Sequence, residues 1–177
     1  MPESTSYEFI SHRWVVLGLG NLLYGDEGFG IHAMRMLMDC IEKPDILAFV
    51  DGGVLGLDLL PLVETSNHLL LLDAVDAGKP PGTVVELDMD QIPLLSGIKL
   101  SEHQLGFQEV LALAFLRGNL PTHLHLIGVQ PASMTTSIYL SQEVSASLPE
   151  VIRRSNEALQ SWGLIEIACQ DKQSEIV

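Results

Sequence analysis

The segment that decides the fold is Trp14-Val-Val-Leu-Gly-Leu-Gly-Asn-Leu-Leu-Tyr-Gly-Asp-Glu-Gly-Phe-Gly30. Its first six residues, 14–19, include no polar side chain, which is typical of a strand buried on both faces of a parallel sheet. A glycine-rich turn follows, and from Gly30 to Ile41 apolar residues recur at helical spacing. A buried strand joined by a tight turn to an amphipathic helix is the building unit of α/β folds.

The same alternation continues along the chain. Further strands are predicted over residues 46–50, 68–72, 83–87 and 123–129, and further helices over residues 55–63, 105–117 and 141–161. The run 68–72 is the most apolar, so we expect a central strand that ends at Asp73, whereas the alternation in 83–87 indicates an edge strand. Strands separated by helices predict a three-layer α/β/α sandwich around a mostly parallel sheet.

Composition narrows the possible classes of protein. The chain has 177 residues, 47% of them hydrophobic and 18% charged, which suits one domain with a sizeable core and excludes extensive disorder. A formal net charge of −14 argues against nucleic-acid binding and against docking on anionic membranes. Cys40 and Cys169 are far apart, which excludes a disulfide framework or a cysteine-based zinc site. With no signal-peptide pattern in residues 1–8 and no apolar run near ~20 residues, we expect a cytoplasmic protein without membrane insertion.

Ligands of such sheets bind beyond the carboxyl ends of the strands. Glu27 follows the first strand, Asp73 the central strand, and His103 precedes a predicted helix. Each has an ordinary explanation, because acids favour helix starts and aspartates commonly end strands. Together, two carboxylates and an imidazole suit zinc, nickel or a similar ion. We expect the three on an exposed rim, where a substitution changes the free energy of unfolding by only about 0.5 kcal/mol.

Other sites are weaker candidates. Residues 28–33 match the dinucleotide pattern G-x-G-x-x-A, and Asp51 follows at ~20 residues, but Asp26 and Glu27 would repel a pyrophosphate. H-E-x-x-H and G-x-S-x-G are absent, which excludes a zincin motif and a nucleophile elbow. His123 and His125 have no carboxylate close in sequence, so we expect them on a solvated or helix-covered face.

Six motifs occur in an order that resembles one family. They are Gly18-Leu-Gly-Asn-Leu-Leu-Tyr-Gly-Asp-Glu-Gly-Phe-Gly30, Asp51-Gly-Gly53, Leu71-Leu-Asp-Ala-Val-Asp76, Pro81-Gly-Thr83, Ser101-Glu-His-Gln-Leu-Gly106 and Ile127-Gly-Val-Gln-Pro131. From about Trp14 to the last predicted helix, the chain resembles the nickel–iron hydrogenase maturation endopeptidases. Val54 stands where many members have threonine. The resemblance implies a single domain of this type over residues 12–169, with flexible ends at 1–11 and 170–177, and a twisted mixed sheet between helical layers.

The resemblance also implies an activity. Members remove a C-terminal extension from the hydrogenase large-subunit precursor after nickel insertion, cutting after a His or Arg. The family's metal ligands and catalytic residues fall on Glu27, Asp73 and His103. The expected cofactor is a divalent metal, with nickel favoured, that the substrate itself could supply.

Two accounts of this activity stay open. The metal activates water against the scissile carbonyl, or the three ligands recognise nickel already held by the precursor; we favour the second. Asp51 and Asp76 are then expected to orient the ligands. If Gly28 and Gly30 let the loop approach the substrate closely, a side chain at either should block binding without unfolding the domain. The alternative function is a non-enzymatic nickel chaperone or metal-binding module on the same fold.

Overall fold

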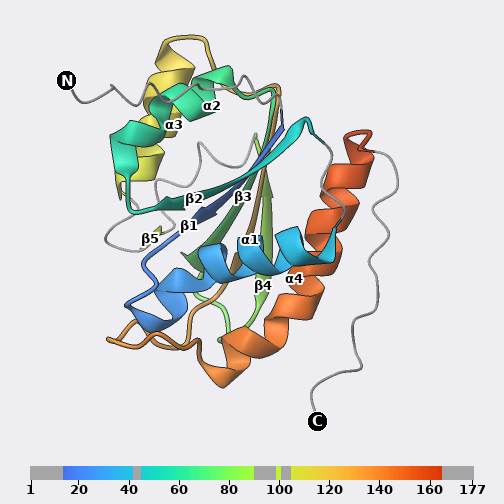
Figure 1. Cartoon of the computed structure of the whole chain (residues 1–177). Helices are drawn as coiled ribbons and strands as arrows, with labels where there is room; N and C mark the ends of the chain where they lie inside the picture. Colours follow the sequence, from blue (N-terminus) through green and yellow to red (C-terminus); the bar gives the residue numbers. More distant parts are fainter. Residues whose placement is uncertain (1–13, 42–44, 90–98, 101–104, 165–177) are drawn as a thin grey trace, which may run out of the picture.

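A twisted sheet divides the molecule into three layers (Figure 1). The computed structural model describes residues 14–41, 45–89, 99–100 and 105–164. The strands of this part are β1 (Trp14–Leu19), β2 (Leu47–Gly53), β3 (His68–Asp76), β4 (Val84–Asp88), β5 (Lys99–Leu100) and β6 (His123–Val129). Their order is β2-β1-β3-β6-β4, and β5 pairs with β3 outside this path. The limits of the expected domain, its flexible ends, His103 and Cys169 all lie outside the described residues.

The sheet is mixed, as expected. The pairs β1–β2, β1–β3 and β3–β6 are parallel, whereas β4 runs antiparallel to β6 and β5 antiparallel to β3. The alternation in 83–87 correctly indicates an edge strand, because β4 is the last strand in the order. The expectation that the central strand ends at Asp73 is wrong. β3 continues to Asp76, because β6 pairs with Asp73 and Ala74 and β5 pairs with Val75 and Asp76.

Each face of the sheet carries its own apolar core. On one face lie α1 (Phe29–Cys40) and α4 (Gln142–Ser161), and on the other lie η2 (Gly56–Leu59), α2 (Leu60–Thr65) and α3 (Leu105–Leu116) (Figure 1). Side chains of a strand alternate between faces, so Leu70 and Leu72 of β3 join the first core and Leu69 and Leu71 the second. A strand covered on both sides must therefore be apolar throughout. None of the described helices is long and apolar enough to cross a membrane.

The first helix lies in direct backbone contact with the sheet at Gly30. A Cβ atom at this position would lie 2.0 Å from the carbonyl oxygen of Leu72 and 2.5 Å from that of Leu19. Gly18 of β1 takes part in the same contact, because a Cβ atom added there would lie 2.6 Å from the carbonyl oxygen of Gly30. These neighbours are backbone atoms of two strands and cannot turn aside. A side chain at Gly30 would therefore displace α1 from the sheet, so its effect is not confined to the loop that was expected to approach the substrate.

Replacing Gly30 tests this contact. We expect Gly30→Ala to lower the free energy of unfolding by about 3 kcal/mol, because the added methyl group forces α1 away from β1 and β3. The matched control is Gly78→Ala, where φ is +64° and no atom lies within 4 Å of the added Cβ. The control should lose only about 1 kcal/mol, from the left-handed conformation alone. Urea unfolding followed by circular dichroism measures both, and equal losses in the two variants would contradict the proposed clash.

Candidate active site

Glu27 lies in η1 (Gly25–Gly28), the short turn that leads into α1. The chain reaches this position by folding back over the end of β1. Gly20 has a φ of +121°, and a Cβ there would lie 1.7 Å from the carbonyl oxygen of Glu27, so only glycine fits. The turn η1 packs against β3. Glu27 is 2% exposed, so its carboxylate is buried inside the protein.

Asp73 lies on β3 and is 1% exposed. Its Oδ1 accepts a hydrogen bond of 2.8 Å from the backbone N–H of Ala74. The residue before it, Leu72, has the carbonyl oxygen that lies against Gly30. Gly30 in turn follows Glu27 by three residues. Both predicted carboxylates therefore belong to the region where η1 and the start of α1 pack against β3. The expectation of an exposed rim is wrong for both, because this close packing buries them.

The third predicted ligand, His103, lies outside the described residues, so the structure does not place it relative to the two carboxylates. Within the described ranges, no group of three or more His, Cys, Asp or Glu side chains is arranged to hold a metal ion. The three-residue site of Glu27, Asp73 and His103 thus stays a prediction. Two buried carboxylates nevertheless fit a cation chemically, since buried charges are stable when paired or coordinated to a metal.

A further acid, Asp26, organises this region, and sequence analysis missed its role. It is fully buried, and its Oδ2 accepts hydrogen bonds of 2.9 Å from the backbone N–H groups of both Ala132 and Ser133. Its Oδ1 accepts a third bond, of 2.6 Å, from the N–H of Ser141. The loop between β6 and α4 is therefore fastened to the turn that carries Glu27. Two consecutive acids in an otherwise apolar segment were the available signal.

The carboxylates expected to orient the ligands bond to other groups. Asp51 forms an exposed ion pair of 3.0 Å with Arg35 of α1. Asp76 accepts a hydrogen bond of 3.1 Å from Nε2 of the buried Gln130. Oε1 of Gln130 in turn accepts bonds from the backbone N–H groups of Ala77 and Lys79. Asp76 and Gln130 thus fix the turn after β3, which gives the Gly-Val-Gln-Pro motif a structural function.

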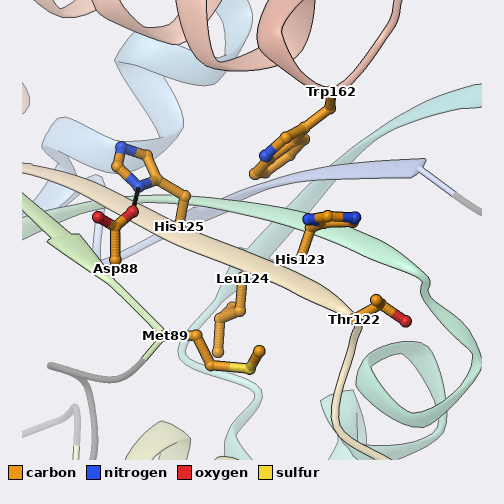
Figure 2. Close-up of a pocket in the computed structure, with 7 residues that line it drawn as sticks. All are labelled: Asp88, Met89, Thr122, His123, Leu124, His125 and Trp162. Carbon is orange, nitrogen blue, oxygen red and sulfur yellow. Dashed lines mark hydrogen bonds and ion pairs between the residues drawn. The ribbon is translucent and has the colours of Figure 1, made fainter.

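The described residues also form a shallow cavity of about 390 Å³, which lies at the opposite ends of the strands from Asp73. It is lined by Asp88, Met89, Thr122, His123, Leu124, His125 and Trp162 (Figure 2). These residues gather at the amino end of β6, whereas Asp73 pairs with Gly128 near the carboxyl end of that strand. The cavity is therefore separate from the candidate active site.

The two histidines of this cavity have partners that sequence analysis missed. Nδ1 of His125 lies 2.7 Å from Oδ1 of Asp88 (Figure 2). Nε2 of the same ring lies 3.3 Å from Oε2 of Glu86. Both acids come from β4, which is distant in sequence but pairs with β6. His123 instead stacks on His68, with ring centroids 4.4 Å apart, and His68 stacks on Trp14 at 3.9 Å. His123 is exposed, which agrees with the predicted solvated face, whereas His125 is partly buried beside two acids of β4.

Comparisons with known proteins agree with this fold. A family model described as hydrogenase maturation protease matches residues 31–157. The hydrogenase expression/formation protein HupD of Rhizobium leguminosarum bv. viciae is 39% identical over 154 residues, 86% of this chain and 76% of that protein. Hydrogenase 2 maturation protease of Escherichia coli (strain K12) is 35% identical over 153 residues, 86% of this chain and 93% of that protein. The solved structure of the hydrogenase maturating endopeptidase HybD from E. coli superposes with a TM-score of 0.81 at 34% identity, covering 85% of this chain and 94% of that one.

The chain is thus a hydrolase of the peptidase class on an α/β fold. It belongs to the hydrogenase maturation protease family. This membership decides against the non-enzymatic nickel chaperone or binding module, and against a dinucleotide-dependent oxidoreductase.

The bonds of Asp26 lead to a stability prediction. Asp26→Asn should lower the free energy of unfolding by about 3 kcal/mol, because an amide –NH₂ then faces backbone N–H groups that need an acceptor. Asp58→Asn, at an exposed position of η2, is the control and should change it by less than about 0.5 kcal/mol. Thermal and urea unfolding measure the difference, and an Asp26→Asn variant as stable as the control would refute the structural role.

Proposed function

We propose that the protein removes the C-terminal extension of a nickel–iron hydrogenase large-subunit precursor after nickel insertion, and that it recognises the bound nickel through Glu27, Asp73 and His103. The observation that carries this proposal is the burial of Glu27 and Asp73 where η1 packs against β3, in a member of the hydrogenase maturation protease family. Carboxylate oxygens with an imidazole nitrogen are suitable ligands for nickel.

Each residue has a separate task in this proposal. Glu27 and Asp73 offer negative charge in a region from which packing excludes water, so their attraction for a cation is stronger than at an exposed surface. His103 binds as the neutral imidazole and must lose its proton first. Nickel, which arrives with the precursor, supplies a cation that unloaded precursor lacks. Recognition of the cargo thus makes cleavage conditional on correct loading.

The central experiment incubates the purified protein with nickel-loaded and nickel-free precursor and measures the C-terminal mass of each product. We expect cleavage of the loaded precursor alone. Glu27→Gln, Asp73→Asn and His103→Ala should each abolish it, because each removes one nickel ligand. The control is Asp58→Asn, which removes an exposed carboxylate of η2 and should cleave normally. Circular dichroism verifies that every variant is folded. Cleavage of nickel-free precursor, or normal cleavage by two of the three ligand variants, would refute nickel recognition.

Metal removal separates the substrate's nickel from a resident ion. Protein treated with a chelator and then desalted should process nickel-loaded precursor at an unchanged rate, because the ion it recognises arrives with the substrate. The rate is measured from the ratio of precursor to product by mass spectrometry. A loss of activity that added metal restores would instead show that the enzyme works with a metal of its own.

A further inference from the structure

Six large apolar side chains are exposed on three loops that follow the carboxyl ends of β1, β2 and β6. Their exposed fractions range from 42% to 77%. We call this set the apolar rim: Leu23, Tyr24, Val54, Leu55, Ile138 and Tyr139. Single exposed apolar residues are common on protein surfaces, but a group of them on neighbouring segments marks a site of interaction with another protein.

Backbone hydrogen bonds join the three loops to one another. The N–H of Gly25 donates to the oxygen of Ser137 at 2.7 Å, and the N–H of Ser137 donates to the oxygen of Leu23 at 3.1 Å. On the other side, the N–H of Gly20 donates at 3.0 Å to the oxygen of Gly53, the residue before Val54. Figure 1 shows the loop after β6 running beside the segment between β1 and α1. The apolar rim is thus a bonded surface and not three independent loops.

The apolar rim is also continuous with the candidate active site. Leu23 and Tyr24 directly precede η1, the turn that carries Glu27. Asp26 accepts hydrogen bonds from the N–H groups of Ser133 and Ser141, which lie on either side of Ile138 and Tyr139. A surface fixed in this way loses little conformational freedom when it binds a partner, so more of the contact energy appears as affinity. Any partner that rests on it also lies next to the turn that carries Glu27.

We propose that the apolar rim is the docking surface for the folded body of the large-subunit precursor, so that its C-terminal extension reaches Glu27 and Asp73. This inference rests on the proposed function. The continuity with the candidate site favours the precursor over a second copy of this chain, because the precursor is the partner that must come next to the turn that carries Glu27. The members of the apolar rim carry no charge, so the surface of the precursor that contacts them is apolar.

The test replaces two members of the apolar rim that lie on different loops. Leu55→Ser/Tyr139→Ser should raise the KM for nickel-loaded precursor about tenfold or more with little change in kcat, because docking contributes equally to the ground and transition states. The matched control is Phe115→Ser/Leu116→Ser. These residues are 67% and 79% exposed at the end of α3, away from the carboxyl edge, and the control should keep the wild-type KM.

A binding measurement separates this inference from the proposed function. In a Glu27→Gln background, the affinity for intact precursor is measured with and without the two rim substitutions, so cleavage is not needed. A loss of about tenfold or more supports docking at the apolar rim, even if cleavage proves independent of nickel. Unchanged affinity overturns it, even if nickel-dependent cleavage is found. It is also overturned if sedimentation shows that the rim substitutions dissociate a dimer of this chain while KM stays the same.

Discussion

The arrangement of the candidate site depends on one close approach, that of the Gly30 backbone to the carbonyl oxygens of Leu19 and Leu72. Because no side chain separates them, α1 begins directly against β1 and β3, and η1 is held against the central strand. A helix packed through ordinary side chains would lie farther from the sheet and would carry Glu27 with it. The position of this carboxylate near the strand of Asp73 therefore follows from the absence of one Cβ atom.

Two consecutive acids in η1 perform different tasks. The oxygens of Asp26 accept three backbone N–H bonds and hold the loop between β6 and α4. Successive residues in a 3₁₀ turn project about 120° apart, so the side chain of Glu27 leaves the turn in another direction. One acid can therefore hold the protein's own backbone while its neighbour is placed near β3. The sequence Asp-Glu alone does not show which acid takes which task.

Patterns within single segments predicted the elements well, because burial on one or two faces determines which positions must be apolar. The apolar run of β3 indicated a central strand, and the alternation of β4 an edge strand. The end of β3 at Asp76 depends on pairing with β5 and β6, which the local sequence does not show. The same limit applies to the burial of Asp73, the Asp26 bonds to Ala132 and Ser141, and the ion pair of His125 with Asp88. Each joins distant segments, so only the assembled sheet brings the groups together. The three predicted ligands were singled out by their expected places after strands and before a helix, and the resemblance of the motifs then assigned them as ligands.

The hydrogen bonds of Asp26 also affect the order in which parts of the chain fold. Its partners Ala132 and Ser141 lie 106 and 115 residues later in the sequence. Contacts of such high sequence separation form late, because the loop-closure entropy must be overcome first. During synthesis the turn carrying Glu27 leaves the ribosome long before its fastening does. A nascent or truncated chain that lacks the start of α4 therefore cannot complete the hydrogen bonds by which Asp26 holds the loop between β6 and α4.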